Sequence, residues 1–145
     1  AKEINEPGQT YYLYASALKK RNDNTLALQN YLSAAKYLKH DKKTAAPVDE
    51  VYKEMGDLYL NTNNFKEGIS VYKTAYESSQ NPDLKYWLLF NMGQSYHKME
   101  NINEADKIFA QIKTEAGPEG FWAKVVDYYV DDNKWWDKYG AYLVK

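Results

Sequence analysis

The chain of 145 residues contains no cysteine. This absence excludes disulfide bonds, thiolate metal sites and cysteine nucleophiles, but it does not indicate a cellular compartment. There is also no excess of positive charge, because 19 lysine and arginine residues stand against 20 aspartate and glutamate residues. Proteins that bind a nucleic-acid backbone usually carry such an excess. We therefore expect no nucleic-acid partner.

Long hydrophobic runs and catalytic motifs are absent as well. No apolar run approaches the roughly 18 residues that indicate a membrane span, so we expect no direct membrane insertion. The chain has two histidines and no HExxH, GxxxxGK[ST], GxGxxG or GxSxG string. We expect a protein that is not an enzyme and that needs no cofactor or metal. A catalytic site shared with another domain is the alternative.

Aromatic residues, in contrast, are abundant: the sequence has 15 tyrosines, 4 tryptophans and 4 phenylalanines. Tyrosine combines a large apolar ring with a polar tip. A chain so rich in it either packs helices through aromatic side chains or presents an adhesive surface, and both hold if the rings are distributed between core and surface.

One spacing of small and aromatic residues occurs three times. A shift of 37 residues places the second copy on the third, and a shift of 41 residues places the first copy on the second. The coinciding positions hold mostly small or aromatic side chains: Ala15, Ala27, Gly56, Tyr59, Gly68, Tyr72, Gly93, Tyr96, Ala105 and Phe109. Only the connectors differ in length, which is typical of a repeated supersecondary unit with variable loops.

Each copy is predicted to be a pair of helices. In the second copy Tyr52, Met55 and Tyr59 recur at steps of three and four residues, which places them on one helical face. Asparagine-rich breaks follow the first helix of each copy, and asparagine both caps helix starts and tolerates turn geometry. Gly56 and Gly68 are predicted to face each other, so that the two backbones cross closely.

The pattern resembles the tetratricopeptide repeat, whose signature runs W-x2-L-G-x2-Y, then A-x3-F, then a closing proline. The copy that fits best reads Tyr52, Met55, Gly56, Tyr59, Gly68, Tyr72 and Ala75. The periods of 37 and 41 residues exceed the roughly 34 residues of the family, and the closing proline is absent or displaced.

The resemblance implies an all-α fold, an α-solenoid of stacked antiparallel helical hairpins in a single domain of residues 1–145. The three repeats are predicted at about 8–40, 48–80 and 85–115, followed by atypical closing helices at about 119–143.

The segment 119–143 is predicted to be a degenerate fourth pair, whose second helix begins near residue 133. Terminal repeats are often atypical because they must close an exposed apolar face. The aromatic residues of that second helix are therefore interpreted as closing the core, with a protein-binding surface as the alternative: Trp135, Trp136, Tyr139 and Tyr142.

The resemblance further implies a non-catalytic module that binds a peptide or protein in a concave groove lined by the first helix of each pair. Removing the core-facing positions leaves the candidate groove residues: Gln9, Tyr12, Ser16, Lys19, Glu50, Lys53, Asp57, Leu60, Trp87, Phe90, Gln94 and His97. Trp87 and Phe90 are predicted to form one aromatic patch with His97 at its edge. The alternative for Trp87 is packing under the preceding loop.

Chaperone-binding members of the family grip a terminal carboxylate with Lys, Asn and Arg side chains. This chain has other residues at the matching positions: Tyr12, Ser16, Glu54, Trp87 and Asn91. Capture of a chaperone tail is therefore disfavoured. The alternative to a groove-binding module is a structural segment of a longer repeat scaffold, or a self-associating assembly protein without a groove of its own.

Overall fold

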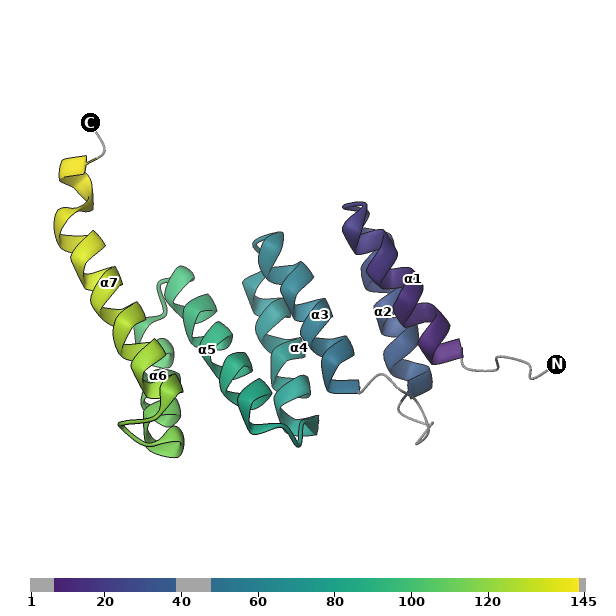
Figure 1. Cartoon of the computed structure of the whole chain (residues 1–145). Helices are drawn as coiled ribbons and strands as arrows, with labels where there is room; N and C mark the ends of the chain where they lie inside the picture. The colour runs from purple at the N-terminus through teal and green to yellow at the C-terminus, as the bar shows by residue number, and fades with distance from the viewer. Residues whose placement is uncertain (1–6, 39–47, 144–145) are drawn as a thin grey trace. The chain divides into compact units, whose positions relative to one another are not determined.

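The computed structural model describes residues 7–38 and 48–143, apart from the side chain of Tyr142, and every regular element in these residues is an α-helix. The helices are α1 (Pro7–Lys20), α2 (Asn24–Leu38), α3 (Val48–Asn61), α4 (Phe65–Ser78), α5 (Pro82–Lys98), α6 (Ile102–Ala116) and α7 (Phe121–Leu143) (Figure 1).

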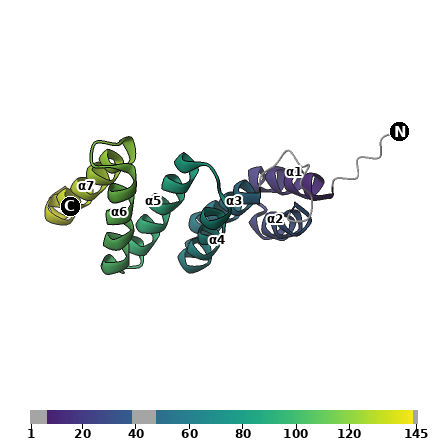
Figure 2. The same ribbon diagram turned by 90° about the horizontal axis from the view of Figure 1, so that it is seen from below.

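The chain divides into two compact units, Ala1–Leu88 and Leu89–Lys145. The predicted single domain stays a prediction, and the units are described one at a time. In the first unit α1 packs on α2 and α3 packs on α4, and both views show each pair side by side (Figures 1 and 2). Helix α2 also packs on α3, so the two hairpins are joined. The predicted all-α helical-repeat fold is confirmed.

The turns between paired helices have the same backbone geometry in all three copies. Each turn contains one residue with φ near +60°: Asn22 (62°), Asn63 (61°) and Glu100 (62°). These positions are related by the same shifts of 41 and 37 residues as the helices. In each turn the next N–H donates to a carbonyl five residues earlier: Asp23 to Leu18 (3.0 Å), Asn64 to Tyr59 (2.8 Å) and Asn101 to Tyr96 (2.9 Å). This left-handed helix end satisfies carbonyls that would otherwise lack donors.

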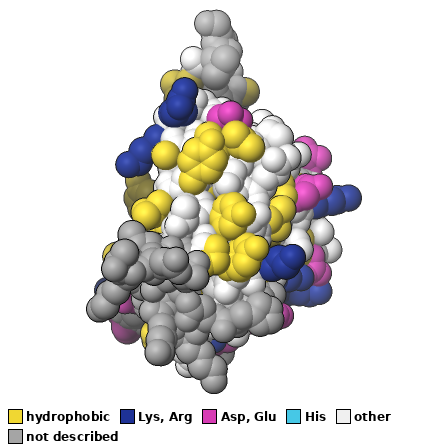
Figure 3. All heavy atoms as spheres, turned by 90° about the vertical axis from the view of Figure 1, so that its right-hand side faces the viewer, with side chains coloured by type: hydrophobic (Ala, Val, Ile, Leu, Met, Phe, Trp, Pro, Cys, Tyr) yellow, Lys and Arg dark blue, Asp and Glu magenta, His cyan; other side chains and the backbone are white. Residues whose placement is uncertain are grey.

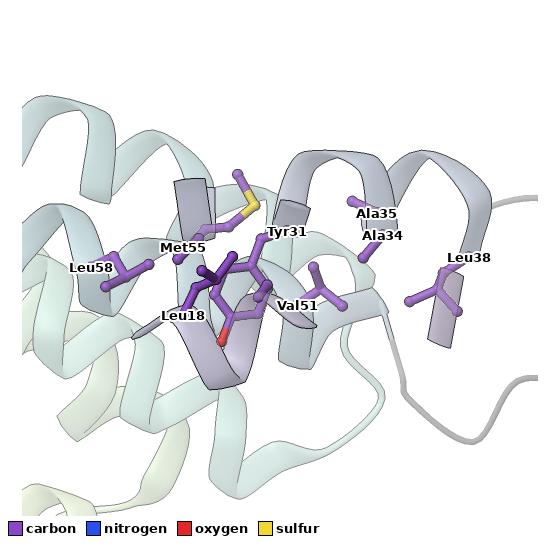
Figure 4. Close-up of a cluster of buried hydrophobic side chains, with 10 residues drawn as sticks. Leu18, Tyr31, Ala34, Ala35, Leu38, Val51, Met55 and Leu58 are labelled. Atoms are coloured by element: carbon purple, nitrogen blue, oxygen red, sulfur yellow. The ribbon is translucent and has the colours of Figure 1, made fainter. Parts of the chain in front are cut away.

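The core of the first unit draws on three helices, α1, α2 and α3 (Figure 4). Its buried members are Ala15, Leu18, Ala27, Tyr31, Ala34, Ala35, Leu38, Val51, Met55 and Leu58. Tyr31 of α2 lies among side chains of α1 and α3 in this cluster, and it is fully buried. Burying one large apolar side chain stabilises a fold by about 1.5–3 kcal/mol. Since the cluster spans both hairpins, they share one interior.

The small residues of the repeat make room for aromatic rings. A Cβ atom built on Gly56 would lie 2.4 Å from Cε1 of Tyr72, and one on Gly93 would lie 2.5 Å from Cε1 of Phe109. A Cβ on Gly68 would meet Leu60 Cδ1 at 2.1 Å and the Gly56 carbonyl oxygen at 3.5 Å. Gly68 therefore lies against the backbone of α3 at Gly56, as predicted. The space beside Gly56 and Gly93 themselves is filled by a ring from the second helix.

Five of the other repeat positions are buried: Ala15, Ala27, Tyr72, Ala105 and Phe109. Tyr59 and Tyr96, at the ends of their first helices, stay partly exposed.

In the second unit α6 packs on α7. The prediction of two closing helices at 119–143 is wrong, because α7 runs without interruption from Phe121 to Leu143. Its first half has Val126 at the position of Gly56 and Gly93, and Lys138 follows where the other copies have a small residue. Side chains of this size prevent a close helix crossing, so a fourth hairpin is not favoured.

The aromatic residues at the end of α7 do not close the core. Trp135, Trp136 and Tyr139 are 46%, 49% and 41% exposed. The Tyr142 side chain lies outside the described part of the structure. The exposed rings instead leave a large aromatic surface on this helix.

Candidate functional site

The candidate residues of the first unit lie on α1, α3 and the start of α5, and all are partly exposed. We call six of them the first-unit surface: Tyr12, Ser16, Lys19, Lys53, Asp57 and Trp87. Because the neighbouring helical positions Ala15, Leu18 and Met55 are buried, the helices orient these six side chains away from the core. They are nevertheless held in place by ion pairs, hydrogen bonds and ring contacts, some with one another and some with neighbouring residues.

Ion pairs connect α1 with α3 on this surface. Lys19 Nζ donates a hydrogen bond to Glu54 Oε2. Lys53 Nζ lies 3.1 Å from Asp57 Oδ2 and 3.8 Å from Glu54 Oε1. Glu54 therefore lies between two lysines. Glu54 is not among the groove residues predicted from the sequence. Its pairing with Lys19 depends on the packing of α1 against α3, which residue spacing within one helix does not reveal.

Trp87 extends this charged network to α5. The Lys53 ammonium lies 4.4 Å from the centroid of the Trp87 ring. Tyr72 meets the same ring edge-on, with centroids 5.7 Å apart and planes at 88°. Such a cation–π contact contributes about 0.5–1 kcal/mol at an exposed site. Trp87 thus lies between a surface cation and a core tyrosine.

Two core tyrosines reach the surface with their hydroxyl groups. Tyr72 Oη donates to Asp57 Oδ1 at 2.5 Å, and Tyr31 Oη lies 3.2 Å from Ser16 Oγ. Burial raises the pKa of Tyr31 to about 12, although the hydrogen bond with Ser16 opposes the rise. Burial, with the charge of Asp57, raises the pKa of Tyr72 further. Both hydroxyls stay protonated at neutral pH, so Tyr72 acts as a donor that fixes Asp57.

Two groups at the edge of this surface are partly removed from water. Burial raises the pKa of the Glu50 carboxyl, while Lys53 lowers it. Among the described residues, Gln9 Oε1 is buried without a hydrogen-bond partner. Gln9 and Glu50 occupy the same position in successive copies. A partner that offers hydrogen-bond donors would suit this edge.

The candidate residues of the second unit are Phe90, Gln94 and His97, and their surroundings are aromatic. Phe90 meets Tyr129 edge-on at a centroid distance of 5.5 Å, and it also lies 6.1 Å from Phe109. His97 Nδ1 lies 3.2 Å from Tyr129 Oη. Tyr129, which sequence analysis did not select, thus links Phe90 with His97. Its place in α7 matches that of Tyr59 and Tyr96, and this register is the signal that could have identified it.

An apolar recess of about 350 Å³ adjoins Phe90, and its lining is aromatic and aliphatic apart from one lysine. Its walls are Phe90, Phe121, Lys124, Val125, Tyr128 and Tyr129. The predicted patch of Trp87 with Phe90 draws on both units and stays a prediction.

A further exposed surface lies on the first hairpin. Figure 3 shows hydrophobic side chains gathered on one face of the first unit. The large exposed hydrophobic residues of α1 and α2 are Leu13, Tyr14, Leu26, Leu32 and Tyr37. None of these five residues is among the candidate groove residues.

Within residues 7–38 and 48–143, no group of histidine, aspartate and glutamate side chains is arranged to hold a metal ion. None of the helices in this part of the chain combines the length and the apolar character needed to span a membrane.

Comparison with known families identifies two matching segments. The family model described as Tetratricopeptide repeat matches residues 50–82 and 88–114. The first segment contains nearly all of α3, all of α4 and the start of α5, and the second contains the end of α5 and most of α6. No curated protein matches the chain. The family resemblance inferred from residue spacing is confirmed for these two segments, and the first hairpin shares their turn geometry.

Proposed function

Because this chain carries tetratricopeptide repeats, we propose that it is a non-catalytic module that binds a peptide or protein along the first helices of its hairpins. Repeats of this family generally mediate interactions between proteins, and in a solenoid the first helices line the concave side. The observation that carries the proposal is the first-unit surface, whose partly exposed side chains are preorganised by ion pairs and by Trp87.

Preorganisation supports a binding role for physical reasons. Long lysine side chains lose rotamer freedom when a partner immobilises them, which weakens binding. Here Lys19 and Lys53 are already held by Glu54 and Asp57, so part of that entropy loss has occurred before a partner arrives. Trp87 adds a rigid ring, and tryptophan is enriched among the residues that dominate binding energy.

The two units offer different chemistry to a partner. The first-unit surface presents paired charges and polar acceptors, which suit a segment with both charged and donor groups. The recess next to Phe90 suits a large apolar side chain.

Trp87→Ala and Phe90→Ala test this function separately in each unit. Partner recovery by affinity capture is compared with the melting temperature of each variant, and Leu32→Ala on the exposed face of α2 is the matched control. We expect both test variants to lose recovery by more than any loss of stability explains, while the control retains it. Unchanged recovery in folded Trp87→Ala and Phe90→Ala variants would refute the assignment.

A structural segment of a larger repeat scaffold is the second candidate, and the apolar face of the first hairpin favours it (Figure 3). Under this alternative Leu32→Ala changes assembly, whereas Trp87→Ala does not. The same three variants therefore separate the two functions.

A further inference from the structure

Helix α7 carries an exposed apolar stripe along most of its length. Its members follow one another at alternating steps of four and three residues, with Asp132 as the single polar interruption: Phe121, Val125, Tyr128, Asp132, Trp135 and Tyr139. Phe121 and Tyr128 are 72% and 77% exposed. Alternating steps of four and three residues are the pattern of a coiled-coil seam.

The opposite side of α7 already packs within its own unit. Ala123 and Val126 are buried, and Tyr129 contacts the rings of Phe90 and Phe109. The exposed stripe is therefore a second apolar face. The recess lined by Phe121, Val125 and Tyr128 forms part of this face and gives it depth.

We propose that the stripe pairs α7 with α7 of a second copy, as an antiparallel two-helix coiled coil. This inference concerns self-association and does not depend on the partner proposed for the first helices. The contact is isologous, so each copy presents the same surface to the other. Helix α7 has 23 residues and therefore spans about 34 Å at 1.5 Å per residue. This length gives the pair about three heptads of seam.

Charge complementarity selects the second copy and the antiparallel direction. Lys124, Asp131 and Lys138 lie seven residues apart along one edge of the stripe, and all three are exposed. When two such helices run antiparallel with Asp132 opposite Trp135 of the other copy, Asp131 of each copy approaches Lys138 of the other. Two-fold symmetry produces this pair twice. In a parallel dimer the same edge would meet Trp122, Tyr129 and Trp136, which provide no countercharge.

Asp132 fits this assignment as a register-setting residue. A single polar side chain in a coiled-coil seam lowers stability but fixes the register and the number of strands. In the antiparallel register, Asp132 lies close to the two-fold axis at the midpoint of the paired helices. A shifted register would move Asp132 away from this axis and would separate Asp131 from Lys138 of the other copy.

Sedimentation equilibrium of the whole chain over a wide concentration range tests the dimer. We expect a dimer that dissociates on dilution. The double variant Tyr128→Glu/Trp135→Glu should be monomeric at every concentration, since it places charges in the seam. The matched control Leu32→Glu, on the exposed face of α2, should dimerise like the parent. Circular dichroism confirms that each variant keeps its helices.

Charge reversal tests the direction of the helices. Asp131→Lys and Lys138→Asp should each raise the dimer dissociation constant about tenfold, because two ion pairs become like-charge contacts. The double variant Asp131→Lys/Lys138→Asp should restore the parent value. A parent chain that is monomeric throughout, or a dimer unaffected by Tyr128→Glu/Trp135→Glu, would overturn the proposal. A dimer that ignores both charge reversals would overturn the antiparallel arrangement.

Discussion

The two units hold equivalent aromatic rings in different ways. In the first unit Tyr72 packs over Gly56 and its hydroxyl group donates to Asp57. In the second unit Phe109 packs over Gly93, and Gln94 stands at the position equivalent to Asp57. The ring and the glycine are the same in both units, whereas the hydroxyl and its carboxylate acceptor occur in only one of these two.

This difference shows which part of the repeat is fixed by packing and which part is free to vary. The close approach of two helices requires a small residue under a ring, so both units keep that pair. The hydroxyl group is not needed for packing. In the first unit it connects the core to a charged surface, and in the second unit its loss leaves an aromatic cluster that includes Phe90 and Tyr129.

Alanine at the two glycines should produce the largest effect. Gly56→Ala and Gly93→Ala each place a methyl group against a ring, at a cost of about 1–3 kcal/mol, while the better helix propensity of alanine returns about 1 kcal/mol. We expect the larger loss for Gly56→Ala, because Asp57 fixes the far end of the Tyr72 ring. Denaturant unfolding measures both values. An equal or larger loss for Gly93→Ala would contradict the idea that the hydroxyl restrains the ring.

Removing the hydroxyl group of a core tyrosine should produce the second-largest loss of stability. Tyr72→Phe leaves Asp57 without this donor and should lower the free energy of unfolding by about 1.5 kcal/mol, as expected for a hydrogen bond to a charged group. Tyr31→Phe removes a neutral pair with Ser16 and should cost about 0.5–1 kcal/mol. Tyr14→Phe, at an exposed position of α1, is the control and should change nothing. If the two core variants lose the same free energy, the charge of Asp57 is unimportant.

The parts of the fold that could be predicted are those that helical periodicity and turn composition determine. The steps between Tyr52, Met55 and Tyr59 identify the core face of α3, and the asparagine-rich breaks locate the left-handed turns. The uninterrupted course of α7 was harder to predict, because asparagine and aspartate at 131–133 also suit a turn. Val126 and Lys138 in place of small residues were the signal against a fourth hairpin.

The candidate surface was less predictable than the fold. Periodicity assigns Lys53 and Asp57 to one face of a helix, and the structure pairs them. The contacts of Lys19 with Glu54 and of Tyr129 with Phe90 join different helices. Such contacts depend on how helices pack against one another, which the spacing within a single helix does not encode.

A smaller effect is expected at the turn of the second unit. Glu100 adopts the left-handed conformation that asparagine adopts at the corresponding turns of the first unit. Glycine has no Cβ strain there, so Glu100→Gly should raise the free energy of unfolding by about 0.5–1 kcal/mol. Asn63→Gly is the matched variant and should gain less, since asparagine tolerates this conformation. A destabilised Glu100→Gly variant would show that the glutamate makes a compensating contact.

The smallest effect concerns Glu50 in the first unit. Burial raises its pKa in the folded state, so its contribution to stability is fully present below the unfolded pKa and is lost as the pH rises through the folded pKa. Glu50→Gln should therefore be slightly more stable than the parent at pH 7, and this advantage should vanish in acid. Thermal unfolding across this pH range measures the difference. A variant less stable than the parent at pH 7 would mean that attraction to Lys53 outweighs burial.

Site-specific photo-crosslinking tests the central claim most directly. A benzophenone amino acid replaces Tyr12 or Phe90 on the first helices. In the controls it replaces Tyr37 or Ile102 on the second helices, and each of these two residues is 45% exposed. Crosslinked partner is then quantified by mass spectrometry. The binding assignment predicts crosslinks from Tyr12 and Phe90 and few from the controls. Equal or greater yields from Tyr37 and Ile102 would contradict a partner bound along the first helices.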